Sequence, residues 1–245
     1  MIALFADIHG NREALSACLA DAARRNAGRY VFLGDLVGYG ADPAWVVDRV
    51  SEYMAGGAVA VRGNHDAAAA GEPVAMDRTA ADAIAWTRGE LDEARQAFLA
   101  NLPLTAEEGD RLYVHASADE PACWHYVVDS HRAQKSLEAT ARPQSFCGHV
   151  HRPALYFRSR AGTVSAFAPT AGVAVPLLPG RHWLAVLGAV GQPRDRNPAA
   201  CYGLLDEADN TLTYVRVPYD VASAARKIRD AGLPAVLAAR LEQGY

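Results

Sequence analysis

The sequence lacks the features that mark several special classes of protein. Its four cysteines form no Cys-x-x-Cys pair, which excludes a disulfide scaffold and a zinc ribbon. It has no run of lysine or arginine, and its 24 basic and 28 acidic side chains give a net charge of −4. That balance argues against a nucleic-acid-binding surface over the whole chain, though not against a local one. With 51% apolar and 21% charged residues in 245 positions, the composition is that of a globular protein and not of a disordered or coiled-coil one.

No targeting or membrane segment is predicted either. The first residues carry no basic region, and their apolar run stops at Asp7, unlike a signal peptide. The later apolar stretches 164–179 and 183–191 contain prolines or are too short to cross a bilayer. We therefore expect a cytoplasmic protein with reduced thiols.

The first quarter of the chain alternates between short apolar strands, polar loops and helices. Three strands are predicted, at 1–6, 30–33 and 57–61. After the first strand, apolar residues recur with helical spacing from Leu15 to Ala22, and Asn11 is the expected N-cap. Pro43 opens a second helix. This order is typical of an α/β protein, in which chemistry lies at the carboxyl ends of the strands.

The rest of the chain continues this alternation and then changes. A helical region is predicted at 74–101, a strand at 112–115, a helix at 131–140 and a strand at 144–147. Residues 153–217 contain short strands separated by Gly, Pro and Asp-Asn turns, which favours antiparallel β-structure. Two helices, separated at 232–234, are expected after Pro218. No repeat or linker divides the chain, so we expect a single domain over residues 1–245.

Five of the eight histidines lie in short motifs at the ends of predicted strands. The motifs are Asp7-x-His9, Gly34-Asp35, Gly63-Asn64-His65-Asp66, the single His115 and His149-x-His151. On extended backbone, residues i and i+2 point the same way, so one strand end can direct two such side chains at one point. Carboxylate oxygens and neutral imidazoles are ligands for divalent Mn, Fe, Zn or Ni. Two ions about 3.5–4 Å apart need a shared ligand with two oxygens, for which Asp35 is the candidate, and Asn64 offers an amide oxygen.

Each motif alone has an ordinary structural explanation. Gly-Asp is a common turn, and a lone histidine such as His115 is more often a core residue with its hydrogen bonds satisfied. Only the complete set, with a member at each predicted strand end of an α/β alternation, favours a metal site.

The ordered set resembles the motif blocks of the calcineurin-like metallophosphoesterases, all of which are present between residues 7 and 151. Three further segments resemble a small prokaryotic branch of that family, whose members are labelled phosphoesterases or diadenosine tetraphosphatase-like. These segments are Gly34–Pro43, Val190–Asp195 and the tail from Pro218 to Leu241. The resemblance implies an α/β fold: a four-layer α/β/β/α sandwich in which two mixed β-sheets pack together between layers of helices.

The resemblance also implies a role for each motif residue. Asp7, His9 and His151 would bind one metal ion, Asn64, His115 and His149 would bind the other, and Asp35 would bridge the two. His65 would assist the leaving group as an acid, and Asp66 would fix its ring. The implied reaction is hydrolysis of a phosphate ester or anhydride by a hydroxide that bridges the two ions. Manganese is the first candidate metal, with iron, zinc and nickel as the others.

A small phosphorylated substrate, such as a nucleotide or a phosphodiester, is the expected partner. Arg12 and Arg194 lie beside motif loops and, with Asn64, are candidates for binding it. For Trp124 and Tyr126, which follow His115, packing in the core is favoured over stacking on a base.

Three other functions remain open at this point. A nuclease acting on DNA or RNA would use the same metal centre, but the charge of −4 without a basic run argues against it. A protein phosphatase would need peptide-binding additions for which the chain has little room. A non-catalytic scaffold or regulatory protein of the same fold would be expected to lose metal ligands, whereas this sequence keeps all seven and His65. No membrane partner is expected.

Overall fold

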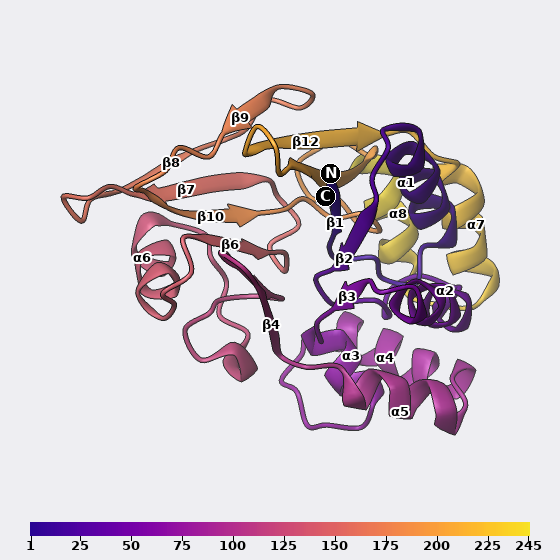
Figure 1. Cartoon of the computed structure of the whole chain (residues 1–245). Helices are drawn as coiled ribbons and strands as arrows, with labels where there is room; N and C mark the ends of the chain where they lie inside the picture. Colours follow the sequence, from indigo (N-terminus) through magenta and orange to yellow (C-terminus); the bar gives the residue numbers. More distant parts are fainter.

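Two six-stranded sheets form the centre of the protein, described for residues 1–245 by a computed structural model (Figure 1). The first sheet has the order β3 (Val59–Ala60), β2 (Arg29–Phe32), β1 (Ile2–Phe5), β11 (Ala200–Asp206), β12 (Thr211–Val217) and β9 (Ala174–Pro176). The second has the order β4 (Thr105–Glu108), β5 (Arg111–Val114), β6 (Gln144–Cys147), β10 (His182–Val186), β7 (Ala154–Arg158) and β8 (Val164–Phe167). Each sheet combines strands from distant parts of the chain.

Both sheets are mixed. In the first, β1, β2 and β3 run parallel, and β11, β12 and β9 add antiparallel pairs. In the second, β5, β6 and β10 run parallel, and β4, β7 and β8 pair antiparallel with their neighbours. The antiparallel structure predicted for residues 153–217 is therefore correct except at β10, which also pairs in parallel with β6.

The two faces of each strand serve different layers of the core. Ile2 and Leu4 of β1 pack against Phe146 and other residues of the second sheet. Ala3 and Phe5, which alternate with them, pack on the opposite face against helical residues such as Leu15. This alternation with a period of two buries both faces of the strand.

Helices cover the outer faces of both sheets. The helices of the chain are α1 (Arg12–Arg24), α2 (Pro43–Ala55), α3 (Asn64–Ala69), α4 (Arg78–Glu90), α5 (Glu93–Asn101), α6 (Ser130–Glu138), α7 (Val221–Asp230) and α8 (Ala235–Gln243), with a 3₁₀ turn at Pro121–Cys123. Of these, α3 packs against α4 and α5, and α4 and α5 pack against α2 rather than on a sheet. In Figure 1, α6 covers the second sheet on the left, and α1, α2, α7 and α8 lie beyond the first sheet on the right. The predicted four-layer α/β/β/α arrangement is confirmed. None of the helices combines the length and the apolar character needed to cross a membrane.

Several predicted boundaries are correct and others are not. Asn11 caps α1 by accepting from the Ala14 N–H, α2 begins at Pro43, and β6 has the predicted bounds. The helical region 74–101 is two helices, because the chain leaves the helix at Leu91 and Asp92 caps the next one by accepting from the Arg95 N–H. Neither β4 nor the short α3 was predicted from the sequence. Helix α3 begins at Asn64, inside a motif.

The parallel strands aim their carboxyl ends at one region. Asp7 and His9 follow β1, Asp35 follows β2, and the Gly63–Asp66 motif follows β3. From the second sheet, His115 follows β5, and His149 and His151 follow β6. The two sheets thus deliver their polar loops to a common edge, as expected for α/β sheets.

Candidate metal centre

The motif loops bring seven predicted ligands into two buried groups that share one carboxylate. One group is Asp7, His9, Asp35 and His151, and the other is Asp35, His115 and His149; within each, the ligand atoms lie within 4.8 Å of one another. Asn64 joins the second group, since its Oδ1 lies 3.2 Å from His115 Nε2. The two groups match the partition expected for two ions, and Asp35 is common to both.

We expected an extended backbone at these residues, and that expectation is wrong. Asp7, His9, Asp35, His149 and His151 all have positive φ angles, between 49° and 68°. This left-handed region costs a residue other than glycine about 1–3 kcal/mol, and such strain clusters at functional sites. Hydrogen bonds between the loops hold it: the N–H of Asp7 donates to Gly34 O (3.2 Å) and that of His9 to Asp35 O (2.9 Å).

The turned backbone also explains why His149 and His151 serve different groups although they are two residues apart. The His149 N–H donates to both carboxylate oxygens of Asp7, at 3.0 and 2.9 Å. The loop after β6 is therefore fixed directly to the loop after β1, and the two sheets are joined at the site.

Backbone carbonyls set the protonation of three of the histidine rings. Nδ1 of His9 lies 3.1 Å from Val37 O, Nδ1 of His115 lies 2.7 Å from Leu33 O, and Nδ1 of His151 lies 2.6 Å from Gln192 O. Because a carbonyl oxygen can only accept, each Nδ1 carries the proton. Each ring then directs Nε2 toward the cluster, where it offers a lone pair whenever it carries no second proton. This is the usual orientation of a metal-binding histidine.

These lone pairs face one another across short distances. His9 Nε2 and His151 Nε2 are 3.1 Å apart, and His115 Nε2 is 3.1 Å from His149 Nδ1 and 3.3 Å from Asp35 Oδ2. Facing acceptors repel unless a proton or a cation lies between them. Two nitrogens that bind one ion at about 2.1 Å lie about 3.0 Å apart at a right angle and about 3.4 Å apart at a tetrahedral angle. The residues present therefore fit divalent cations at both groups.

Burial and the neighbouring charges shift the pKa values in the cluster. Burial raises the pKa of Asp7 to about 7 and lowers the pKa values of His9 and His151 well below their usual range. Burial opposes the charged forms of His115 and Asp35 as well, but their mutual attraction outweighs it. The pKa of His115 rises to about 9 and that of Asp35 falls. Without a metal ion, the His115 imidazolium is thus the cation that balances Asp35.

His65 stands beside the first group without belonging to it. Its ring meets the His9 ring edge-on at 4.9 Å and lies 4.5 Å from the Tyr39 ring, and its buried Nδ1 has no hydrogen-bond partner. Its backbone N–H donates to Asp35 Oδ1 at 2.8 Å. The carboxylate proposed to bridge the ions therefore also positions the residue expected to act on the leaving group.

The expectation that Asp66 fixes the His65 ring is wrong. Asp66 Oδ1 accepts from the N–H groups of Leu36 and Val37, and Oδ2 accepts from the Gly63 N–H at 2.9 Å. All its hydrogen bonds go to backbone because α3 begins inside the motif and turns the carboxylate toward the loop after β2. Asp66 thus ties together the two loops that carry Asp35 and His65.

Gly38 limits the space around His65, and sequence reasoning missed it. Its φ is +85°, and a Cβ at this position would lie 2.5 Å from His65 Nδ1. We expect Gly38→Ala to displace the His65 ring and to lower kcat about 10–100-fold while the metal content stays at the wild-type level. Metal analysis and steady-state kinetics test this, with Gly89→Ala in α4 as the control, since a Cβ there meets nothing within 4 Å. Unchanged kcat in Gly38→Ala would contradict it.

Comparison with known proteins agrees with this arrangement. A family model described as the calcineurin-like phosphoesterase superfamily domain matches residues 1–210. The chain belongs to this superfamily. It is 33% identical over 250 residues to an uncharacterised protein of Methanocaldococcus jannaschii, covering 100% of this chain and 98% of that one.

Solved structures extend the likeness to the fold. A metallophosphoesterase from Sphaerobacter thermophilus superimposes with a TM-score of 0.87 at 33% identity, over 100% of this chain and 98% of its own. A hypothetical protein from Pyrococcus horikoshii superimposes with a TM-score of 0.80 at 17% identity, over 100% and 99% of the two chains, and shows the same fold. The protein is a phosphoesterase of the hydrolase class.

Of the two arginines predicted to bind substrate, the structure brings one to the centre of this phosphoesterase. Arg194 lies over the Tyr39 ring at 5.7 Å, and its backbone N–H donates to His151 O at 3.2 Å. Arg12, the first residue of α1, instead lies 5.1 Å from the centre of the Trp45 ring. It makes no hydrogen bond or ion pair with the Asp and His side chains of the cluster.

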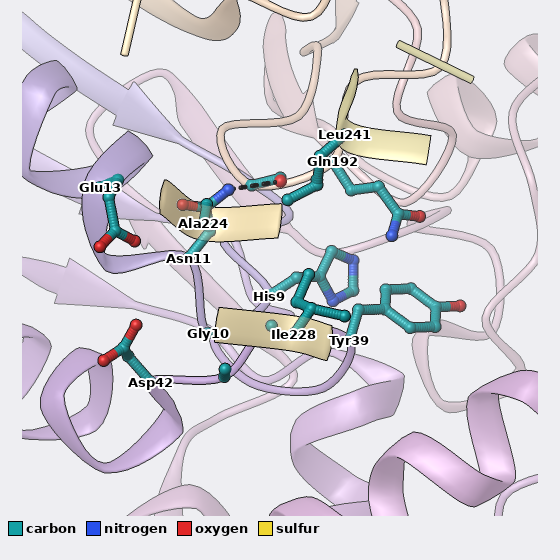
Figure 2. Close-up of a pocket in the computed structure, with 13 residues that line it drawn as sticks. His9, Gly10, Asn11, Glu13, Tyr39, Asp42, Gln192, Ala224, Ile228 and Leu241 are labelled. Carbon is teal, nitrogen blue, oxygen red and sulfur yellow. Dashed lines mark hydrogen bonds between the residues drawn. The ribbon is translucent and has the colours of Figure 1, made fainter. Parts of the chain in front are cut away.

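A cavity behind His9 is too small to hold the substrate of this phosphoesterase. It lies between the motif loops and helices α7 and α8, and His9, Tyr39 and Gln192 are among its lining residues (Figure 2). Its volume of about 10 Å³ is close to the space of a single water molecule. The Asn11 amide donates to Gly191 O across one side at 2.9 Å, shown as a dashed line in Figure 2. The residues around this cavity therefore pack against the first ligand group through His9.

Proposed function

We propose that this phosphoesterase hydrolyses small phosphate esters or anhydrides at a centre of two divalent cations. The observation that carries the proposal is the shared position of Asp35 between two buried groups whose lone pairs converge. Asp7, His9 and His151 would hold one ion, and Asn64, His115 and His149 the other. When bound, two such ions supply Lewis acidity, which activates water and offsets the charge on phosphoryl oxygens. Manganese is our first candidate, followed by iron, zinc and nickel.

The chain's own residues complete the chemistry. His65 would protonate or hydrogen-bond the leaving oxygen, and its ring packs against the rings of His9 and Tyr39. General acid assistance of this kind contributes about 10²–10⁴-fold. Arg194, whose backbone N–H donates to His151 O, donates through Nε and Nη2 to Gln192 Oε1. Its guanidinium would pair with a phosphoryl oxygen of the substrate.

A basic cleft next to the centre supports an anionic substrate. Arg152, Arg194 and Arg196 line this cleft of about 690 Å³, and Asp195 is the single carboxylate side chain among its lining residues. Asp195 is paired with Arg216, so the three arginines keep most of their positive charge for a ligand. The net charge of −4 therefore conceals a local basic surface.

The test is hydrolysis by protein that has been stripped with a chelator and reloaded with Mn²⁺, Ni²⁺ or Zn²⁺. Phosphomonoesters, aryl diesters, cyclic nucleotides and dinucleoside polyphosphates form the substrate panel. We expect no turnover before loading and turnover of at least one class after it. If the reloaded protein binds the metal and cleaves none of them, the scaffold function is favoured and the enzymatic one fails.

Metal affinity is expected to rise with pH. Without metal, His115 keeps a proton up to about pH 9 and Asp7 keeps one up to about pH 7. The ion held by Asp7 must displace the Asp7 proton, and the ion held by His115 must displace the His115 proton, so a higher pH favours the binding of both ions taken together. Each displaced proton makes the affinity about tenfold stronger per pH unit, so the slope is steeper below pH 7 than above it. Competition against a chelator of known affinity from pH 6 to pH 8.5 measures this, and an affinity independent of pH would contradict it.

A further inference from the structure

A second cleft opens on the other side of the centre, beside the second ligand group. Its volume is about 640 Å³, and it lies between the segments 73–75 and 122–128, with Asn64 and His149 among its lining residues. That size is within the range of clefts that bind small organic ligands. Its wall combines apolar residues, such as Val74 and Val128, with polar ones. No Asp or Glu side chain lines it, and Arg132 is the only lysine or arginine that does.

Two large apolar side chains at this cleft are exposed to solvent. Tyr126 is 50% exposed and Val128 is 59% exposed. The Tyr126 ring stacks on the ring of His149, with centroids 4.0 Å apart and an angle of 26° between the planes. The prediction that Tyr126 packs in the core is therefore wrong. The Tyr126 ring lies on the proposed metal ligand His149, and half of the surface of Tyr126 stays exposed to solvent.

The backbone that presents these side chains is strained. Glu120 and Trp124, on either side of the 3₁₀ turn, both have positive φ angles, of 51° and 54°. Trp124 is only partly buried, and its ring meets the His115 ring edge-on at 5.9 Å. The loop thus places the Trp124 ring against His115 and the Tyr126 ring against His149. Backbone strain of this kind clusters at functional sites.

We propose that this cleft binds a flat aromatic group of the substrate, an aryl ring or a nucleobase, while the phosphate of the same molecule occupies the centre. The proposal rests on the proposed function and names its substrate class: phosphate esters that carry an aromatic ring. Stacking on Tyr126 and contact with Val74 and Val128 bind the ring, and the absence of carboxylates in the wall avoids repulsion of the attached phosphate. Stacking on an aromatic side chain strengthens binding about tenfold or more.

A comparison of two non-hydrolysable ligands tests this on the wild-type, metal-loaded protein. Phenylphosphonate and methylphosphonate carry the same anionic group and differ in the ring. We expect calorimetry to give a Kd for phenylphosphonate about tenfold lower, and Tyr126→Ala to remove that difference while Tyr126→Phe keeps it. Phe167→Ala is the matched control, because Phe167 is also an exposed aromatic residue (38%) but lies on β8, outside the cleft.

The outcomes separate the two proposals. If neither phosphonate binds to the metal-loaded protein, the proposed function fails. If both bind with equal Kd, or if Tyr126→Phe loses as much as Tyr126→Ala, the aromatic cleft is overturned and the proposed function stands. The kcat/KM values for phenyl, nucleoside and methyl phosphate esters then distinguish an aryl ring from a nucleobase. For each aromatic ester, the ratio of its kcat/KM to that of the methyl ester is compared between the wild type and Tyr126→Ala. The ester whose ratio falls about tenfold in the variant belongs to the class that uses the cleft.

Discussion

Asp35→Asn is expected to lose both metal ions and to lower kcat/KM on the order of 10³-fold or more. Asp35 belongs to both ligand groups, with Oδ2 3.3 Å from His115 Nε2 and 3.7 Å from His9 Nε2. An amide of the same shape removes the negative charge and offers one oxygen in place of two. Lewis acid chemistry contributes several kcal/mol to such reactions, and each 1.36 kcal/mol is tenfold in rate. Metal analysis after gel filtration, together with steady-state kinetics, measures both effects.

Asp48→Asn is the matched control for this variant. Asp48 is an exposed carboxylate of α2 that pairs with Arg95 and belongs to neither ligand group. Its variant should keep full metal content and activity. An Asp35→Asn protein that retains two ions, or one that loses them and still turns over substrate, would contradict the shared position of Asp35.

His65→Ala is expected to lower activity without a loss of metal: both ions stay bound, and kcat falls about 10²–10⁴-fold. His65 is outside both ligand groups, yet its ring lies 4.9 Å from that of His9, so its loss removes a proton donor and not a ligand. The drop should be smaller for substrates with a good leaving group, such as nitrophenyl esters, because these need less assistance from an acid. Comparing kcat for nitrophenyl and alkyl esters therefore tests the role of His65 in leaving-group departure.

The exposed His131 of α6 provides the control for a lost histidine. His131→Ala should match the wild type in both metal content and kcat. If His65→Ala releases an ion, His65 is a ligand and its assigned role is wrong. If kcat falls equally for good and poor leaving groups, His65 acts on another step.

The fold was predictable where the pattern of apolar residues decides the structure locally. The strand β1 follows directly from the unbroken apolar run Ile2–Phe5, and the start of α2 follows from Pro43. The strand β4 does not, because Thr105–Glu108 contains two glutamates and forms only through its pairing with β5. The parallel pairing of β10 with β6 joins residues that are about 40 positions apart, and no local pattern encodes it.

The residues of the candidate site could be predicted from the sequence, but their backbone conformation and hydrogen-bond partners could not. The motifs that carry Asp7 and His149 are visible in the sequence, but their left-handed backbone is not. The carbonyls that orient the histidine rings, such as Val37 O and Gln192 O, come from distant loops whose residue type carries no signal. The backbone partners of Asp66 escaped prediction for the same reason.

A titration of activity with metal counts the ions that hydrolysis requires. Chelator-treated protein is titrated with Mn²⁺ under conditions of tight binding, and hydrolysis of an aryl phosphate ester is followed at each addition. We expect activity to reach its plateau at two equivalents of metal per chain. A plateau at one equivalent, or turnover that is independent of added and residual metal, would contradict a two-ion centre built around Asp35.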